Sequence, residues 1–356
     1  MTRARKLLVM AGGTGGHIYP GVAVAEALRA RGWQIAWMGN ADRMEGRIVP
    51  GYGYEPAWIR FGALRGKGLL PKLLLPLNLL RGFWQAWRAI GRVRPDVVIG
   101  MGGYVSFPGG MMASLRGCPL VVHEQNSVAG LANRVLAGVA DRVVSGFPDV
   151  LRAARWLGNP VRADIAALAP PAQRFAGRTG PLRILVVGGS LGAQALNGVV
   201  PRALALLPAA LRPQVTHQSG TAQIDALRAA YAAAGVEGEL LPFIDDMAQR
   251  YAQADLVICR AGALTVAELA AAGVGSVLVP FPSAVDDHQT GNARFLSERG
   301  AAVLMPQRTL SAEALAAWLA DASREKLLGM AEAARALARA DAAEAVADLC
   351  EALCRT

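Results

Sequence analysis

The amino-acid sequence predicts an α/β protein built from two doubly wound domains, each with a parallel sheet. Three observations predict this fold. Short aliphatic runs, typical of strands buried on both faces, alternate with longer helix-like stretches along the chain. A strand, a glycine-rich turn and a helix follow one another near the amino terminus, and the same pattern restarts after Pro181. The length of 356 residues fits about two domains at roughly 150 residues each.

The predicted elements follow from this alternation, taken in chain order. The strands are Leu7–Met10, Gln34–Met38, Val97–Ile99, Leu120–His123, Arg142–Val144, Arg183–Val187, Gln214–Gln218, Leu256–Cys259, Ser276–Val279 and Ala302–Met305. The clearest helix-like segments are Ala23–Arg31, Gln194–Leu207, Thr221–Ala234 and Glu313–Leu319. The stretch Ala166–Gly180 is rich in Ala, Pro, Gly and Arg, and is predicted to be a linker.

Composition limits the class of protein. A hydrophobic content of 53% with 18% charged residues excludes a disordered chain. The net charge of +10 favours anionic partners such as phosphates, acidic lipid headgroups or nucleic acid. Four scattered cysteines without a CxxC pair argue against a disulfide framework or a zinc site and favour a reducing compartment. The apolar run 7–11 is too short for a signal peptide, and no apolar window is long enough to span a bilayer, so a cytoplasmic, soluble or peripheral protein is expected.

The first glycine-rich turn, Gly12–His17, follows a predicted strand and opens a helix. Glycines allow close approach of a ligand, and a helix amino terminus attracts phosphate. The turn fits a dinucleotide-binding fingerprint poorly, because Ile18 occupies the third glycine position, and the chain has no P-loop motif. His17 is either a neighbour of the helix cap or a general base.

Two further turns lie in the second half of the chain. In Gly188–Gly192, Ser190 either contacts a ligand or caps the following helix. After the strand ending at Cys259, Thr265 and Glu268 have the spacing of a capping box. The alternative is a diphosphate on this helix amino terminus, with Glu268 accepting a hydrogen bond from a ribose.

Polar residues follow several predicted strands. Asp286–Gln289, with Asn292 one turn further, could contact sugar hydroxyls or form a solvated helix start. His123–Asn126 must be paired or face a cleft, because buried polar groups are costly otherwise. Gly100–Tyr104 is either a site for an acceptor phosphate or a tight crossover.

One segment, Gly68–Arg88, combines leucines, two tryptophans and a phenylalanine with flanking Lys and Arg, and residues 64–95 contain no acid. Its prolines and charges exclude a spanning helix. It is either an interfacial element, with apolar side chains at the acyl boundary and cations on anionic headgroups, or an ordinary core helix.

Taken together, these motifs resemble the MurG family of peptidoglycan N-acetylglucosaminyltransferases. The motifs that match in order and spacing are Gly12–His17, Gly102–Tyr104, His123–Asn126, Gly188–Gly192, Gly262–Glu268 and Asp287–Asn292. The resemblance covers essentially the whole chain. It implies a GT-B fold, with two Rossmann-like domains facing across a cleft: residues 1–162 for the acceptor and the membrane, and 163–340 for UDP-GlcNAc. A C-terminal helix, 341–356, would pack back on the first domain.

The implied reaction is inverting transfer of GlcNAc from UDP-GlcNAc to the C4 hydroxyl of the muramyl sugar of lipid I. The product is lipid II, for peptidoglycan synthesis and hence cell-wall biogenesis, cell shape and division. The implied location is peripheral, on the cytoplasmic face of the cell inner membrane, with an anionic phospholipid surface as a partner. No tightly bound cofactor or metal is expected, because no DxD motif follows a strand and a helix amino terminus can stabilise the departing diphosphate.

The resemblance also implies site residues. Glu268 would hold the ribose, Ile244 would hold the uracil through its backbone, and Gln289 and Asn292 would read the sugar, with His288 beside Gln289 as an alternative. The full set expected at UDP-GlcNAc is Thr14, Gly15, Gly16, Asn126, Arg162, Ser190, Ile244, Ala263, Leu264, Thr265, Val266, Ala267, Glu268, Gln289 and Asn292. His17 is the expected catalytic base, and Glu124 is its rival. The candidates for the acceptor phosphate are Gly102, Gly103 and Tyr104, and those for membrane contact are Leu75, Leu79, Phe83, Trp84 and Trp87.

Two other functions are considered. An NAD(P)-dependent oxidoreductase is disfavoured, because the third glycine and the ribose-binding acid are missing. A nucleic-acid-binding protein is disfavoured by the low aromatic content of 6% and by cations that are grouped around leucines rather than interleaved with stacking rings.

Overall fold

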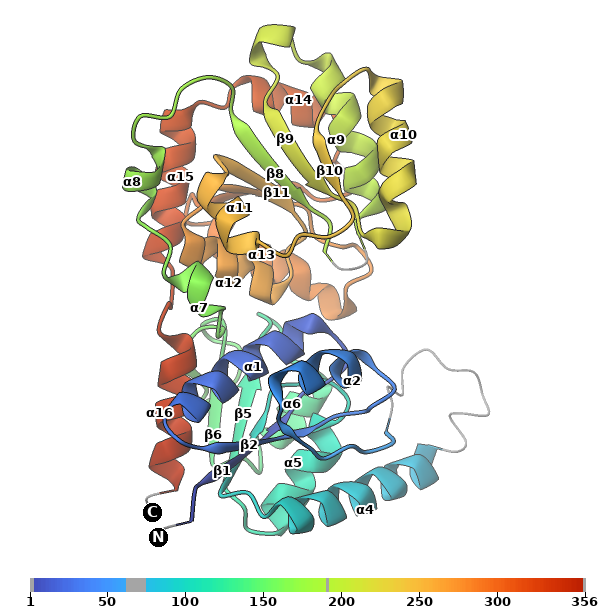
Figure 1. Cartoon of the computed structure of the whole chain (residues 1–356), viewed down its shortest axis with the longest axis vertical. Helices are drawn as coiled ribbons and strands as arrows, with labels where there is room; N and C mark the ends of the chain where they lie inside the picture. Colours follow the sequence, from blue (N-terminus) through green and yellow to red (C-terminus); the bar gives the residue numbers. More distant parts are fainter. Residues whose placement is uncertain (1–2, 62–74, 190–191, 355–356) are drawn as a thin grey trace. The chain divides into compact units, whose positions relative to one another are not determined.

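The structure is a computed structural model that describes residues 3–61, 75–189 and 192–354. The chain forms two compact units, Met1–Arg162 with Ala340–Thr356, and Ala163–Arg339 (Figure 1). Each unit is a parallel sheet with helices packed against it. The predicted α/β class with two Rossmann-like sheets is therefore confirmed.

The sheet of the first unit has the order β3-β2-β1-β4-β5-β6-β7. Its strands are β1 (Lys6–Met10), β2 (Gln34–Met38), β3 (Glu55–Pro56), β4 (Val97–Gly100), β5 (Leu120–Glu124), β6 (Arg142–Ser145) and β7 (Arg155–Trp156). All predicted strands of this unit are present. The strands β3 and β7 were not predicted, because a two-residue strand leaves no pattern in the sequence. The chain order reverses between β1 and β4, and parallel sheets bind ligands at the strand ends beside such a point.

Helices cover both faces of this sheet. They are α1 (Gly15–Ala30), α2 (Met44–Ile48), α4 (Leu75–Val93), α5 (Ser106–Leu115), α6 (Leu131–Leu136) and α16 (Ala342–Leu353). Alternate residues of β1 pack into different cores: Leu7 and Val9 lie with residues of α1 and α16, while Leu8 and Met10 lie with residues of α4 and α5. This double burial explains why the strands are continuous aliphatic runs.

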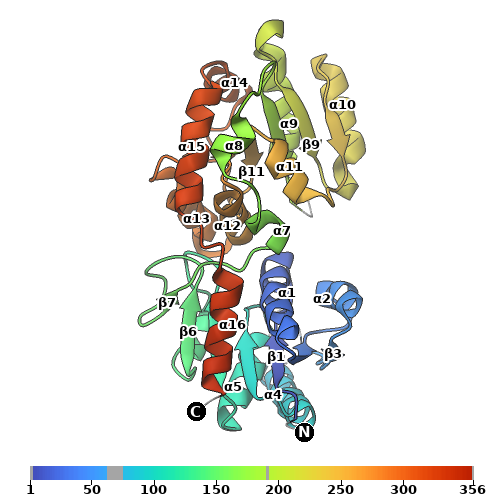
Figure 2. The ribbon, with the colours of Figure 1, turned by 60° about the vertical axis from the view of Figure 1, so that its left-hand side comes forward.

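Helix α16 returns to the first unit and packs against α1 (Figure 2). Arg31, just after α1, forms ion pairs with Asp348 at 2.7 Å, with Glu351 at 3.0 Å and with Glu344. These carboxylates raise the pKa of the Arg31 guanidinium. Cys350 is buried in the core on the same side of the sheet. The carboxyl-terminal helix is thus part of the first unit's fold.

The sheet of the second unit has the order β10-β9-β8-β11-β12-β13. Its strands are β8 (Arg183–Val187), β9 (Gln214–Gln218), β10 (Glu239–Leu241), β11 (Leu256–Cys259), β12 (Ser276–Leu278) and β13 (Ala302–Leu304). Its helices are α7 (Ala163–Ala166), α8 (Pro171–Phe175), α9 (Gln194–Leu206), α10 (Ile224–Ala234), α11 (Met247–Gln253), α12 (Ala263–Ala272), α13 (His288–Ser297), α14 (Ala312–Ala320) and α15 (Arg324–Ala336). The predicted strands are confirmed, and only the short edge strand β10 was missed.

The prediction of a linker at 166–180 is wrong. This stretch contains α8, and Phe175 is buried in the core of the second unit. Arg174 donates to the carbonyl oxygens of Ala272 at 2.6 Å and Gly273 at 2.5 Å, so it satisfies the end of α12. A composition rich in Ala, Pro and Arg resembles a linker, but here Arg174 and Arg178 donate to backbone carbonyls at the ends of α11 and α12 and hold the segment against the second unit.

In the part of the chain that is described, no helix is both long and apolar enough to cross a bilayer. The four cysteines are free thiols.

Candidate active site

Two glycine-rich turns of the first unit pack directly on each other at the carboxyl ends of β1 and β4. Gly103 has a φ of +81°, and a Cβ at this position would lie 2.2 Å from the carbonyl oxygen of Gly12. A side chain there would therefore separate the turns. Thr14 is the N-cap of α1 and makes no side-chain cap bond, and Gly13, Thr14 and Gly16 are exposed. The structure thus presents a helix amino terminus with accessible backbone N–H groups.

The side chain of Glu45 in α2 holds this turn, a role that no sequence motif predicted. Its side chain is completely buried. One carboxylate oxygen accepts from the Gly13 N–H at 3.1 Å, and the other accepts from the Asn40 N–H at 3.0 Å and from the Tyr104 hydroxyl. Burial, and then the bond to Glu45, raise the pKa of Tyr104. One carboxylate therefore joins both turns and the end of β2. In the sequence, Glu45 is an acidic residue in a short segment without a clear helix or strand pattern, which marks it only weakly as part of the site.

His17 lies in the first turn of α1, where it contacts the second turn and the end of β5. Its Nδ1 is 3.1 Å from Oε1 of Gln125. A Cβ on Gly102 would lie 2.8 Å from the same nitrogen. The structure therefore brings together three predicted motifs, Gly12–His17, Gly102–Tyr104 and His123–Asn126, around one imidazole.

Glu124, the rival base, is engaged within its own loop. It is 3% exposed. One oxygen accepts from the Asn126 N–H at 2.9 Å, and the other accepts from the Gly130 N–H at 3.1 Å and from Nδ2 of Asn133 at 2.8 Å. A carboxylate in this arrangement orders the loop that carries Asn126. Both carboxylate oxygens of Glu124 are thus occupied by donors of its own loop and of α6.

In the second unit, α12 begins at Ala263 and has Gly262 as its N-cap. Thr265 and Glu268 are therefore both inside the helix, and the capping-box interpretation is wrong. Glu268 is 8% exposed, and its carboxylate accepts from the Tyr251 hydroxyl at 3.2 Å. The start of α12 has no side-chain cap bond. A glycine N-cap leaves room for a ligand anion at the first N–H groups.

The loops beside α12 are fastened by polar side chains. Nδ2 of Asn292, a fully buried residue, donates to the Ala261 carbonyl at 3.1 Å. Oε1 of Gln289 accepts from the Phe281 N–H at 2.9 Å. Arg260 donates to Oε1 of Gln307 at 2.7 Å and to carbonyls after β12, and burial lowers the pKa of its guanidinium. Asn292 and Gln289 thus shape the strand ends next to α12.

The other predicted donor-site residues occupy varied positions. Ile244 is buried, whereas Arg162, His288, Leu264, Thr265 and Ala267 are partly exposed. Val266 and Ala263 face the interior of the second unit. Ser190 lies outside the described residues. Within 3–61, 75–189 and 192–354, no group of three or more His, Cys, Asp or Glu side chains is placed to hold a metal ion.

The described part of the apolar basic segment forms helix α4, whose two faces differ. Ala86, Ala89 and Ile90 are buried in the core. The opposite face exposes Leu77 and Leu80 at 64% and 65%, together with Trp84 and Trp87. Among the predicted membrane contacts, Leu79 packs against the core, and the Phe83 ring contacts that of Phe107 at a tilt of 59°, with ring centroids 5.7 Å apart. Residues 62–74 and the side chain of Leu75 lie outside the described part.

Arginines border this exposed face. The Arg88 guanidinium lies 5.0 Å from the centroid of the Trp84 ring, and Arg116 lies 3.8 Å from that of Trp87. The helix contains no acidic residue. We name the outward side chains Leu77, Leu80, Trp84 and Trp87 the apolar face of α4. Exposed apolar residues bordered by cations are typical of a surface that meets a partner.

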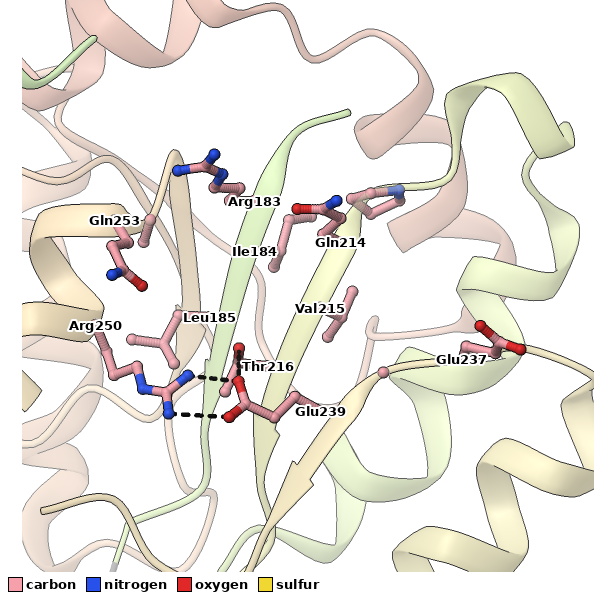
Figure 3. A pocket seen from close by; sticks show the side chains of 13 residues that line it. Arg183, Ile184, Leu185, Gln214, Val215, Thr216, Glu237, Glu239, Arg250 and Gln253 are labelled. Carbon is pink, nitrogen blue, oxygen red and sulfur yellow. Dashed lines mark hydrogen bonds and ion pairs between the residues drawn. The ribbon is translucent and has the colours of Figure 1, made fainter. Parts of the chain in front are cut away.

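A cavity of about 770 Å³ lies in the second unit. Figure 3 shows its walls, which come from β8, β9, the residues around the start of β10 and the end of α11. Arg250 and Glu239 form an ion pair in it, and Thr216 donates to Glu239 at 2.8 Å. None of the predicted site residues lines this cavity.

Comparison with known proteins gives concordant matches. The model described as "Glycosyltransferase family 28 N-terminal domain" matches residues 7–145, and "Glycosyltransferase family 28 C-terminal domain" matches residues 183–349. The chain is 74% identical over 349 residues to the UDP-N-acetylglucosamine--N-acetylmuramyl-(pentapeptide) pyrophosphoryl-undecaprenol N-acetylglucosamine transferase of Aromatoleum aromaticum, which covers 98% of each chain. It is 65% identical over 354 residues to the protein of the same name from Ralstonia nicotianae, covering 99% of this chain and 97% of that one.

Solved structures agree. The crystal structure of Acinetobacter baumannii MurG matches with a TM-score of 0.85 and 40% identity, over 98% of this chain and 99% of that chain. The glycotransferase of kitacinnamycin matches with a TM-score of 0.70 over 99% of each chain. At 18% identity, the latter shows the fold alone.

Proposed function

Because the chain belongs to glycosyltransferase family 28, we propose that it transfers N-acetylglucosamine from UDP-N-acetylglucosamine to lipid I, the undecaprenyl-pyrophosphoryl N-acetylmuramyl-pentapeptide. The chain is a hexosyltransferase of peptidoglycan synthesis, and its product is lipid II. The observation that carries this conclusion is 74% identity over 98% of both chains to a transferase named for this reaction.

The donor is proposed to bind the second unit at the start of α12. The first N–H groups of a helix with a glycine N-cap can receive a diphosphate, and the helix dipole adds to the attraction. Glu268 is proposed to accept from the ribose hydroxyls, since its carboxylate is oriented by the Tyr251 hydroxyl. Leu264, Thr265 and the neighbouring residues 263–267 complete this part of the site.

The uracil and the sugar are proposed to lie at the adjacent strand ends. Ile244 is proposed to contact the uracil through its backbone, Ser190 to lie by the diphosphate, and Arg162 to contact UDP-GlcNAc. Gln289 is proposed to donate to a sugar hydroxyl from its amide nitrogen, because its oxygen already accepts from the Phe281 N–H. Asn292 supports the site through its bond to the Ala261 carbonyl.

His17 is the proposed general base for the acceptor hydroxyl. The C4 oxygen forms a bond to the anomeric carbon as the bond from that carbon to the diphosphate oxygen breaks, with inversion. The hydroxyl proton passes to Nε2 of His17, and the electron pair of the broken bond leaves on UDP. The Thr14–Gly16 turn, Asn126 and the turn Gly102–Tyr104 are proposed to place the acceptor. The negative charge on the departing diphosphate is stabilised by backbone N–H groups of α12.

The first experiment is UDP release from UDP-GlcNAc with and without a soluble lipid I analogue. Release that depends on the analogue is expected, and equal release in both samples would contradict the transfer reaction. A His17→Ala protein is expected to lose about 10²- to 10⁴-fold in kcat, which is the range that general-base catalysis supplies. Near-normal turnover would exclude His17 as the base and leave the donor site untouched.

The proposed membrane partner is an anionic phospholipid surface, contacted by the apolar face of α4. Tryptophans suit the boundary between acyl chains and headgroups, and each nearby cation contributes about 1 kcal/mol at an anionic surface. Placement of this unit on the cytoplasmic face of the inner membrane would bring the enzyme to its lipid acceptor.

Vesicle sedimentation tests this partner. A Trp84→Ser, Trp87→Ser protein is expected to lose binding to phosphatidylglycerol vesicles. The matched control is Leu211→Ser, which alters a side chain in the second unit that is 54% exposed, and this protein is expected to bind like the parent. Equal binding of the double variant and the control would contradict the assignment.

A further inference from the structure

A chain of hydrogen bonds leads from the interior of the first unit to His17. Nε2 of His123 lies 3.0 Å from the carbonyl oxygen of Gly158, and Nδ1 of His123 lies 3.1 Å from Nε2 of Gln125. Oε1 of Gln125 lies 3.1 Å from Nδ1 of His17. His123 and Gln125 are 0% and 1% exposed, so water does not compete for these bonds.

The direction of each bond follows from the chemistry of its partners. A carbonyl oxygen only accepts, so Nε2 of His123 carries a proton. Burial lowers the pKa of His123 to about 4, so this ring is neutral near pH 7 and its Nδ1 accepts. The amide nitrogen of Gln125 donates to that Nδ1.

The orientation of the Gln125 amide is determined twice. Its nitrogen also lies 3.2 Å from the backbone carbonyl oxygen of His123, a second group that only accepts. The amide oxygen therefore faces His17, and Nδ1 of His17 must donate to it. The backbone of Gln125 is held in turn by Nδ2 of Asn159, which donates to its carbonyl at 2.9 Å.

We propose that Gln125 and His123 are positioning residues that hold neutral His17 in the tautomer with the proton on Nδ1 and the lone pair on Nε2. The tautomer is a property of the folded protein. Its use in catalysis rests on the proposed function, in which Nε2 takes the proton of the acceptor hydroxyl.

The second glycine turn is shaped around this bond. Gly102 has a φ of +88°, and a Cβ there would lie 2.8 Å from Nδ1 of His17 and 3.2 Å from Oε1 of Gln125. Any other residue at position 102 would press on both partners of the bond. This contact by itself requires glycine at position 102, alongside the role proposed above for the turn Gly102–Tyr104.

The arrangement also serves the protonated state. Once Nε2 has taken a proton, the ring is an imidazolium, and the Nδ1–H to Gln125 bond becomes charge-assisted and roughly twice as strong. An amide oxygen here has the orienting role that a carboxylate has in a hydrolytic triad. The titratable groups next to this turn include His123, which is neutral, and Glu45, Tyr104 and Glu124, each bonded as described above. Arg43, just before α2, is a cation that acts on Tyr104.

The decisive experiment is NMR of the full chain labelled with ¹⁵N-histidine, because the shifts of the two ring nitrogens report the tautomer directly. The protein has only four histidines, so single substitutions assign the signals. His17 is expected as the Nδ1–H tautomer, and Gln125→Leu is expected to convert it to a mixture. His217 is an internal control, because its ring is held by Tyr231 and Asn197 in the second unit. An Nε2–H tautomer for His17 in the parent protein, or an unchanged tautomer in Gln125→Leu, would overturn the proposal.

Kinetics separate positioning from a merely structural role. Gln125→Leu is expected to lower kcat on the order of 10²-fold with an unchanged KM for UDP-GlcNAc. Gln125→Glu keeps an acceptor for Nδ1–H, so it is expected to retain the tautomer. Its negative charge raises the pKa of His17 and moves the acidic limb of the kcat/KM profile to higher pH. If both variants lose the same activity and keep the parent's pH profile, the positioning role is excluded. A parent protein that shows the expected tautomer but no lipid-dependent UDP release would instead contradict the proposed function.

Discussion

Replacement of Glu45 by glutamine tests whether one buried carboxylate holds the two glycine turns together. The carboxylate accepts from two backbone N–H groups, one on each oxygen, and from the Tyr104 hydroxyl. A glutamine must turn its NH₂ towards either the Gly13 N–H or the Asn40 N–H. One of these part-buried backbone donors then loses its acceptor and meets an amide donor instead, which costs about 1–3 kcal/mol.

This cost predicts a lower melting temperature for the first unit. At roughly 2–4 °C per kcal/mol for a unit of this size, the transition should fall by about 2–12 °C. Calorimetry measures the shift, and hydrogen exchange of the Gly13 and Asn40 amides locates it. The matched control is Glu332→Gln, an exposed carboxylate on α15, which should change stability by less than about 0.5 kcal/mol. A shift for Glu45→Gln no larger than that of the control would refute the reasoning.

Three further perturbations follow from the same structure. Burial lowers the pKa of His217 to about 3, well below the ordinary 6.5, so the unfolded chain binds more protons between these values. The second unit should therefore lose about 1 kcal/mol from pH 6.5 to 5.5 through this group, and urea titrations of His217→Gln should show a shallower loss. Arg31→Ala removes the ion pairs that hold α16, so it should destabilise the first unit by about 1–2 kcal/mol and speed hydrogen exchange in residues 342–353. The control is Arg228→Ala, which should have little effect because its ion pair with Asp225 is exposed. Gly103→Ala should lower the melting temperature more than Gly117→Ala does. Both glycines have a positive φ, but only at position 103 would the Cβ press against a backbone oxygen. Equal shifts in melting temperature would show that the turns at Gly12 and Gly103 can separate without cost.

Local pattern predicted the regular elements well where they are buried on both faces. The strands Gln34–Met38 and Arg183–Val187 have the boundaries that were predicted, because the residues after their exposed first positions are apolar and mostly buried on both faces of the sheet. The same logic failed for 166–180, where Phe175 and two arginines fasten a segment of linker-like composition. The spacing of Thr265 and Glu268 also left a capping box as an alternative, because the spacing of two side chains does not reveal the residue at which a helix begins.

The sequence by itself determined the alternation of strands and helices, the glycine turns that follow them and the apolar basic segment that becomes α4. These are properties of neighbouring residues, governed by backbone sterics and by periodic burial. Only the tertiary structure decided which polar groups meet. Gln125 reaches His17 across 108 residues, and Glu45 reaches Tyr104 across 59. Such contacts depend on strand order and register, because hydrogen bonds form only within a few tenths of an ångström and no single segment carries that geometry.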